Sequence, residues 1–275
     1  MERLSGLAVD ALNVGGLETA IDLPELKVCV DLGVCPRRLV SRPTVLFTHP
    51  HADHLGGIAS HAATRSLFGQ APPTYVVPPP IVEPLGRLFD AWRDLDQSEL
   101  PLNLVPLAPG ETHAIGKRWE VRAFPTIHPV PSQGYAFFEV KTQLRPELQG
   151  LPQEELSRRG AAGEELSVAT RELRAAITGD TRPEVLEREE LVRTAPLLIT
   201  ECTFLDERVD RAQAEESGHT HLDEWIERAE LFENEVIAFG HFSSRYSAKQ
   251  VREILERRLP AGLRERVHPL LTRFP

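Results

Sequence analysis

The sequence predicts an α/β fold in which helices pack on layered β-sheets. Short β-branched and apolar segments recur along the chain, as at residues 44–47, 74–77 and 196–200, and they have the composition of buried strands. Residues 81–94 instead carry apolar side chains at helical spacing, which predicts an amphipathic helix packed against a sheet. Metal-binding side chains follow several of the strand-like segments, so a functional site at one edge of the sheets is expected.

Composition limits the class of protein. The 275 residues allow one large domain or two small ones, and we interpret residues 1–275 as a single domain. No apolar run reaches membrane-spanning length and the N-terminus lacks a signal-like pattern, which favours a cytoplasmic protein. Three sparse cysteines (Cys29, Cys35 and Cys202) indicate reduced thiols rather than a disulfide framework.

The formal charge of −10, from 31 basic and 41 acidic side chains, argues against a generally basic surface for nucleic acid. A locally basic groove is still compatible with this charge, because bound divalent cations would add positive charge at a site.

In the first half of the chain we expect two or three short strands within residues 6–32, a helix over 58–68 that stops at Gly69, and a strand at 74–77. Residues 104–107, 111–115 and 119–125 have the pattern of antiparallel strands, and 134–140 that of a further strand.

Residues 141–170 differ in character. They are charged, poor in aromatic residues, interrupted by Gly160 and Gly163, and nearly balanced in charge, which predicts a short exposed arm or lid inserted in the domain. Strands are then expected at 175–178, 196–200 and 236–240. Helices are expected at 222–231, with Thr220 as cap and Asp223 at the third position, and at 248–258, with a capping box of Ser247 and Gln250.

The densest cluster of possible ligands is His49, His51, Asp53 and His54, directly after the strand-like segment at 44–47. In a helix His49 and His51 would point to different faces, so the cluster is better explained as a loop that wraps an ion. Imidazole and carboxylate ligands suit zinc and related divalent metals, and more than four ligands would allow two ions. The alternative is a chance cluster of polar residues on a surface loop.

Other candidate ligands follow other predicted strands, namely His128, Asp180, Glu201 and His241. Each alone is more often a structural or turn residue, but together they would supply enough ligands for two ions and a bridging carboxylate. The predicted metal ligands are His49, His51, Asp53, His54, His128, Asp180 and His241. Asp31 is either a turn former or a residue that orients a ligand histidine, and His113 is interpreted as a surface or turn histidine.

Two ions about 3.5–4 Å apart would acidify a bridging water and clamp phosphate oxygens, so the pattern indicates hydrolysis by a metal hydroxide. Asp53 could also accept a proton from the attacking water, and His219, oriented by Glu201, could donate one to the leaving oxygen. The alternative for His219 and His221 is an exposed pair on a loop.

These motifs together resemble the metallo-β-lactamase superfamily. They are His-x-His-x-Asp-His at 49–54, His128, Gly-Asp-Thr at 179–181, Glu-Cys-Thr-Phe at 201–204, His219 and His-Phe-Ser-Ser-Arg-Tyr at 241–246. The Glu-x-Thr-Phe and His-Phe-Ser-x-Arg-Tyr motifs are similar to those of the ribonuclease Z family, tRNA 3′-processing endonucleases, in its short form. The resemblance runs through most of the chain.

The resemblance implies a four-layer αβ/βα sandwich that holds two zinc ions, with manganese or iron as possible substitutes. It implies that His49, His51 and His128 hold one ion, that Asp53, His54 and His241 hold the other, and that Asp180 bridges them. Asp53 would be the base, and Glu201 with His219 the proton donor. Ser243, Ser244, Arg245 and Tyr246 would lie near the phosphate, a role that suits hydroxyl groups and an arginine fork.

The implied activity is that of a zinc-dependent phosphodiesterase, an endoribonuclease that removes the 3′ trailer of precursor tRNA, acting as a homodimer. The chain departs from this family at 141–170. Many members carry a long basic arm there, whereas in this chain the segment is short and Arg158-Arg159 is its only adjacent basic pair. Two alternatives stay open: a hydrolase of a small phosphodiester, cyclic nucleotide or lactone, and a non-enzymatic scaffold with a decayed site.

Overall fold

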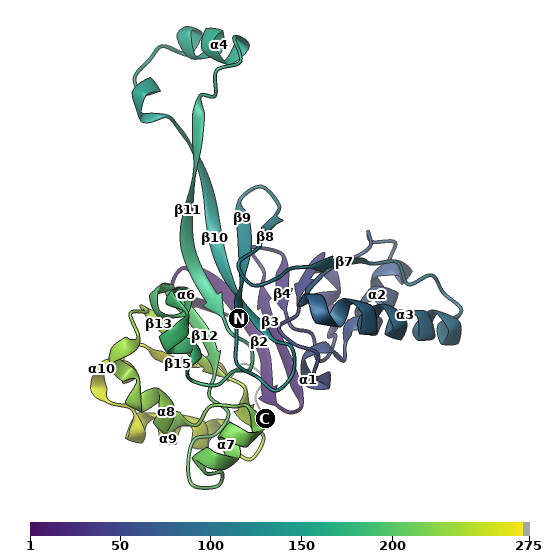
Figure 1. Ribbon diagram of the computed structural model, residues 1–275, viewed down its shortest axis with the longest axis vertical. Helices are drawn as coiled ribbons and strands as arrows, with labels where there is room; N and C mark the ends of the chain where they lie inside the picture. Colours follow the sequence, from purple (N-terminus) through teal and green to yellow (C-terminus); the bar gives the residue numbers. More distant parts are fainter. Residues whose placement is uncertain (272–275) are drawn as a thin grey trace.

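The fold, seen in a computed structural model that describes residues 1–271, is built from two β-sheets (Figure 1). The first sheet has the order β1-β2-β3-β4-β5-β6-β7, and β14 pairs with β2. Its strands are β1 (Glu2–Leu4), β2 (Leu7–Gly15), β3 (Glu18–Leu23), β4 (Val28–Val30), β5 (Thr44–Leu46), β6 (Thr74–Val77), β7 (Asn103–Pro106) and β14 (Phe242–Ser243).

The second sheet has the order β15-β13-β12-β11-β10-β9-β8. Its strands are β8 (Thr112–Ile115), β9 (Trp119–Pro125), β10 (Gln133–Leu144), β11 (Ser167–Ile177), β12 (Leu197–Glu201), β13 (Val236–Gly240) and β15 (Val267–Pro269). Strands β11, β12, β13 and β15 are mutually parallel, so their carboxyl ends meet at one edge of the sheet.

Helices cover the outer faces of both sheets. Figure 1 shows α2 and α3 on one side of the sheets and α8, α9 and α10 on the other. The helices are α1 (Ala52–Leu55), α2 (Ile58–Leu67), α3 (Val82–Asp96), α4 (Gln153–Ala161), α5 (Val185–Arg188), α6 (Glu190–Thr194), α7 (Arg211–Ser217), α8 (Leu222–Glu227), α9 (Ala248–Arg258) and α10 (Ala261–Arg264). None of them is long and apolar enough to cross a membrane.

Three apolar clusters correspond to the three interfaces between these layers. The cluster between the sheets joins Val30 and Leu46 of the first sheet to Phe137 and Ile199 of the second. A second cluster packs α8 and α9 on the outer face of the second sheet, and a third packs α2 and α3 on the first. Burial of apolar side chains in these interfaces is the main driving force for the arrangement. The α/β sandwich predicted from the sequence is confirmed.

One predicted strand lies in a different place. Residues 104–107 were expected to pair antiparallel with the strands that follow, but β7 pairs parallel with β6 in the first sheet. The physical reason is the crossover through α3, because a helical connection between adjacent strands returns the chain in the same direction. Strands β8 and β9 are antiparallel, as predicted, in the second sheet.

The helix expected at 222–231 is shorter, and its cap is a different residue. Helix α8 ends at Glu227, and a separate 3₁₀ turn covers Ala229–Leu231. Its N-cap is His221, with Glu224 completing the capping box, in place of Thr220 and Asp223. The predicted capping box of Ser247 and Gln250 on α9 is confirmed.

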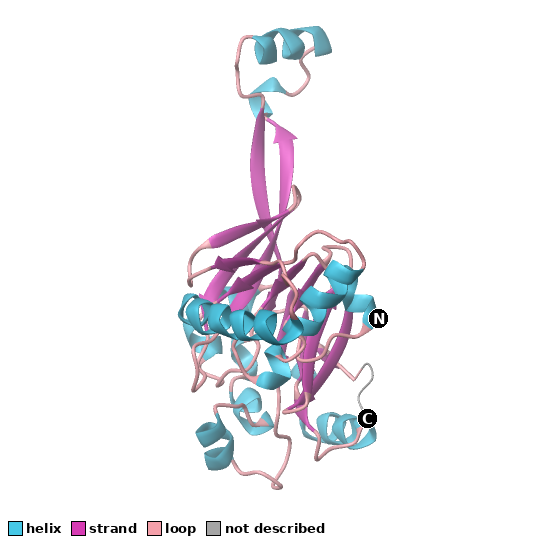
Figure 2. Cartoon of the chain, turned by 90° about the vertical axis from the view of Figure 1, so that its right-hand side faces the viewer, coloured by secondary structure: helices cyan, strands magenta, loops and turns pink. Residues whose placement is uncertain are grey.

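Residues 141–170 extend as a two-stranded ribbon from β10 and β11, with α4 at its tip (Figure 2). The four basic side chains of this arm all form ion pairs with nearby glutamates: Lys141 with Glu172, Arg145 with Glu165, and Arg158 and Arg159 with Glu155. The positive charge of the arm is therefore neutralised within the arm and at its base.

Leu198 tests the packing of the second sheet. Its side chain is fully buried on β12, so Leu198→Ala should lower the free energy of unfolding by about 2–5 kcal/mol, through lost burial and a cavity. Urea unfolding measures this change. Leu231→Ala, at an exposed leucine, is the matched control and should cost less than about 1 kcal/mol. Equal losses in the two variants would contradict this description of the core.

Candidate metal centre

The predicted ligands meet at one edge of the two sheets. Loop 47–51 leaves β5 and leads into the four-residue helix α1, which carries Asp53 and His54. The other ligands follow strands of the second sheet: His128 comes after β9, Asp180 after β11 and His241 after β13. The parallel strands β11 and β13 deliver their ligands to the same edge, which brings together side chains that lie up to 192 positions apart.

One group of ligand atoms belongs to His49, His51, His128 and Asp180, all within 4.8 Å of one another. His49 Nε2 lies 3.1 Å from His51 Nδ1, and His51 Nδ1 lies 3.2 Å from His128 Nε2. Metal–nitrogen bonds of about 2.0–2.1 Å in a tetrahedron place ligand atoms roughly 3.3–3.4 Å apart, so these spacings are close to those of a zinc site.

A second group consists of Asp53, His54 and His241. His54 Nε2 lies 3.2 Å from His241 Nε2, and Asp53 Oδ2 lies 3.4 Å from the same His241 nitrogen. Asp180 faces both groups, because its Oδ2 is 3.3 Å from His54 Nε2 and 3.7 Å from His49 Nε2. The buried Asp180 Oδ1 has no hydrogen-bond partner among the described residues, as expected of an oxygen directed to a metal. The donors therefore fit a pair of divalent ions.

The ring nitrogens that face away from the centre have partners of their own. Asp31 Oδ2 lies 2.8 Å from His54 Nδ1, Thr48 Oγ1 lies 3.0 Å from His49 Nδ1, and the Gly218 carbonyl lies 3.0 Å from His128 Nδ1. Such partners set the ring orientation and select the nitrogen that faces the metal. Asp31 therefore fits both interpretations offered by the sequence, because it contacts His54 and its φ of +58° is one that turn-forming aspartates adopt.

Burial and charge set the protonation states of the centre. Burial lowers the pKa of His49 and of His128, which keeps both imidazoles neutral and able to bind a metal. Burial opposes ionisation of Asp53, but the neighbouring His241 and the charge of His54 outweigh it and lower the pKa of Asp53. Asp53 is therefore a carboxylate at neutral pH.

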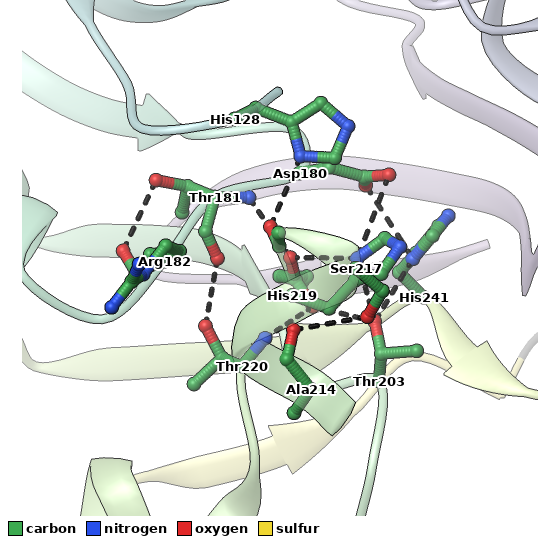
Figure 3. A network of polar contacts seen from close by, with 12 residues as sticks. His128, Asp180, Thr181, Arg182, Thr203, Ala214, Ser217, His219, Thr220 and His241 are labelled. Atoms are coloured by element: carbon green, nitrogen blue, oxygen red, sulfur yellow. Dashed lines mark hydrogen bonds and ion pairs between the residues drawn. The ribbon is translucent and has the colours of Figure 1, made fainter. Parts of the chain in front are cut away.

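Beside the ligands lies an acid–imidazole pair in which Glu201 is buried and His219 is partly exposed; Figure 3 shows His219 next to Asp180 and His241. Glu201 Oε1 lies 3.0 Å from His219 Nδ1, and the Glu201 carboxylate also accepts backbone N–H groups of Thr181 and Thr220, at 2.9 and 3.1 Å. Burial by itself would lower the pKa of His219, but the charge and hydrogen bond of Glu201 raise it to about 9. The imidazole is therefore protonated at neutral pH and placed to donate a proton.

Among the described residues, four histidines lie outside the groups that could hold a metal, and two of them were singled out from the sequence. His221 caps α8 through the backbone N–H of Asp223, and His113 lies in β8. The bond pattern also explains why Thr220 is not the cap, because its N–H goes to Glu201 and its hydroxyl donates to the Thr181 carbonyl.

The four predicted substrate contacts at 243–246 divide into exposed and buried residues. Ser244 and Arg245 are exposed, and Ser243 is buried with its Oγ 3.1 Å from Arg245 Nη1. Tyr246 is only 2% exposed and its hydroxyl accepts the Leu205 N–H, so its predicted contact with substrate does not match this structure. The ring of Tyr246 packs in the apolar cluster between α9 and the second sheet, so the tyrosine anchors the loop to the core.

Sequence reasoning missed Gly16 at the turn between β2 and β3. Its backbone N–H donates to Asp53 Oδ2 at 2.9 Å, and Gly16 has a φ of +75°, which favours glycine. The adjacent pair Gly15-Gly16 was the available signal, since paired glycines mark a close approach of backbone. The turn lies 37 residues before Asp53, so nothing local connected it to the ligand motif.

The profile described as "Beta-lactamase superfamily domain" matches residues 34–242, which defines the class of protein. The chain is 38% identical over 274 residues to "tRNase Z TRZ1" of Arabidopsis thaliana, covering 99% of this chain and 98% of that protein. It is 36% identical over 274 residues to "tRNase Z TRZ2, chloroplastic" of the same organism, covering 99% of this chain and 77% of that protein.

The crystal structure of human tRNase Z, short form, has the same fold, with a TM-score of 0.60 and 20% identity over 86% of this chain and 93% of that one. The chain belongs to the tRNase Z family, also called ribonuclease Z, within the β-lactamase superfamily. It is thus an enzyme of the hydrolase class with a centre for divalent metal.

Gly218 tests the link between His128 and the loop that carries His219. Gly218 has a φ of +77°, and an added Cβ would lie 2.2 Å from Pro129 Cδ and 3.0 Å from His128 Nδ1. Gly218→Ala should displace His128 and weaken zinc binding at least about tenfold, measured by competition with a chelator. Gly163→Ala is the control, since Gly163 has a φ of +82° and open space around it. Unchanged zinc affinity in Gly218→Ala would contradict the link.

Proposed function

We propose that this enzyme is a zinc-dependent endoribonuclease that cuts precursor tRNA at its 3′ trailer and leaves a 3′-hydroxyl on the tRNA. One observation carries the proposal: the seven-ligand cluster and the Glu201–His219 pair lie side by side in a chain that matches a tRNase Z over nearly the whole length of both. Hydrolysis of a phosphodiester at a two-metal site uses two metal ions that bind the phosphate, a general base and a general acid. This site contains candidate residues for each of these roles.

The proposed ligands divide as the distances suggest. His49, His51 and His128 would hold one ion, and Asp53, His54 and His241 the other, with Asp180 between them. When bound, the ions would lower the pKa of a water and stabilise negative charge on the phosphate. Zinc suits this donor set best, and manganese or iron can use the same ligands.

The proton transfers belong to side chains of this chain. Asp53 is ionised and would accept a proton from the attacking water, while the Gly16 N–H holds its carboxylate in place. His219 is protonated and would donate to the leaving oxygen, and Glu201 fixes the imidazole and stabilises its charge.

Exposed residues beside the centre would contact the RNA. Ser244 and Arg245 follow His241 on an open loop, and the guanidinium, oriented by Ser243, is suited to a phosphate. Tyr246 keeps a supporting role in place of the predicted direct contact. The arm at 141–170 has no unpaired basic side chain, so we expect a modest electrostatic contribution from it.

Two further expectations belong to this proposal. A homodimer is supported by apolar side chains left exposed at the ends of α2 and α3, namely Leu67, the adjacent C-cap residue Phe68, and Leu95. The cytoplasmic location predicted from the sequence stays a prediction, since one of the similar proteins is named as chloroplastic.

The central experiment compares two substrates. Zinc-loaded protein should cleave an unprocessed tRNA transcript at the 3′ trailer, with products resolved on a sequencing gel, and should also act on an aryl phosphodiester. Asp53→Ala should reduce both rates at least about 100-fold, because it removes a ligand and the base together. Cleavage of the small ester alone would favour the alternative of a small-phosphodiester hydrolase. Cleavage of neither substrate by metal-loaded protein would favour a scaffold.

The acid role of His219 predicts a pH effect. A general acid works when protonated, so activity should persist at pH values below the pKa of His219 and fall as pH rises through it. Glu201→Gln removes the charge that raises this pKa, so the alkaline limb of kcat/KM should move to lower pH. Glu216→Gln, at an exposed position on α7, should leave the limb in place. An unmoved limb in Glu201→Gln would refute the assignment.

Sedimentation equilibrium tests the homodimer. The wild-type chain should sediment at about twice its 30.7 kDa monomer mass, and the combined substitution of Phe68 and Leu95 by glutamate should shift it toward monomer, because charges would be placed in an apolar contact. Leu231→Glu, at an exposed leucine on the other side of the sandwich, is the control. A monomeric wild type would remove this part of the proposal.

A further inference from the structure

We infer that Thr203 is a positioning residue whose hydroxyl joins the acid pair to one half of the metal centre. Thr203 lies two residues beyond β12, on the segment that runs from Glu201, and is only 4% exposed. Figure 3 shows its hydroxyl beside His219 and His241. Thr203 Oγ1 contacts Glu201 Oε2 at 2.5 Å and His241 Nδ1 at 3.1 Å, while His219 Nδ1 is farther away at 3.4 Å.

The direction of these hydrogen bonds follows from counting protons. Both oxygens of the Glu201 carboxylate already accept backbone N–H groups, so the carboxylate acts as an acceptor and the single proton of the Thr203 hydroxyl is donated to Oε2. The hydroxyl oxygen can then only accept from His241, which places a proton on His241 Nδ1. His241 Nε2 is left with its lone pair, and this is the atom that lies 3.4 Å from Asp53 Oδ2 and 3.2 Å from His54 Nε2. One hydroxyl thus selects the tautomer that binds metal.

A competing acceptor explains why this contact matters. His241 Nδ1 also lies 3.4 Å from Asp180 Oδ1, the buried oxygen that has no hydrogen-bond partner among the described residues. Without the hydroxyl of Thr203, the His241 N–H would turn toward Asp180 and occupy an oxygen that faces the centre. Thr203 therefore keeps both His241 and Asp180 available to a metal.

The acid pair depends on Thr203 less strongly. Glu201 Oε2 keeps the backbone N–H of Thr220 at 3.1 Å, and Oε1 keeps that of Thr181 at 2.9 Å, so the carboxylate stays anchored when the hydroxyl is removed. Loss of the hydroxyl should therefore weaken metal binding more than it weakens proton donation by His219. This order distinguishes a positioning role from general damage to the site.

The test uses Thr203→Val, which keeps the shape of the side chain and removes the hydroxyl, and Thr203→Ser, which restores it. Thr200→Val is the matched control: Thr200 is buried on β12, and its hydroxyl lies 2.9 Å from Thr178 Oγ1 and contacts no ligand. Zinc dissociation constants are measured by competition with a chromogenic chelator. Thr203→Val should bind zinc about 10–100-fold more weakly, and Thr203→Ser and Thr200→Val should stay within about threefold of wild type.

Two additional measurements separate the inference from misfolding and from the proposed function on which it rests. Thermal unfolding of the metal-free proteins should give similar midpoints for Thr203→Val and Thr200→Val, and the cobalt-loaded absorption spectrum should change only in Thr203→Val. Wild-type zinc affinity in Thr203→Val, or a Thr203→Ser variant as weak as Thr203→Val, would overturn the inference. These readouts need no substrate, so failure of the RNA cleavage assay would leave them intact.

Discussion

The buried carboxylate of Asp180 is the constraint on which the rest of the site depends. Asp180 is 2% exposed, and an ionised carboxylate at such a position is costly unless charges and hydrogen-bond donors surround it. Burial opposes its ionisation, yet His241 and His54 outweigh that cost and hold the pKa of Asp180 well below its usual range. The histidines around it contact groups outside the centre: Asp31 contacts His54, and Thr203 contacts His241. These contacts restrict the orientation of the imidazole rings that surround Asp180.

The two sheets place these groups because parallel strands deliver their carboxyl ends to one edge. Strands β11, β12 and β13 carry Asp180, Glu201 and His241 to positions a few ångströms apart, while β5 of the facing sheet contributes the loop with His49. A rigid apolar interface between the sheets keeps these strand ends in register. The candidate metal ligands and the Glu201–His219 pair thus share one support, which explains how loop 217–220 can contact both His128 and Glu201.

The ribbon at 141–170 contrasts with this tightly connected centre. Its strands continue β10 and β11 beyond the layers, and its basic groups are satisfied by glutamates of the same region. The centre concentrates positive charge through the ions it would bind, whereas the arm offers little net charge to an RNA backbone. Recognition of a polyanion by a chain of formal charge −10 would therefore rest on the centre and on a few exposed groups such as Arg245.

The sequence by itself predicted the layered α/β class, the helices at 58–68 and 248–258, and the seven candidate ligands, because periodicity and the spacing of histidines are local properties; the first helix ends one residue earlier in the structure. Only the tertiary structure decided that β7 joins the first sheet, that Tyr246 points inward, and that Gly16 and Thr203 contact the centre. These features depend on contacts between segments far apart in the chain. The residues involved are of common types, and their local sequence gives no sign of the contact. Their roles follow from the polar atom each one faces, which only the packing of the two sheets brings into contact.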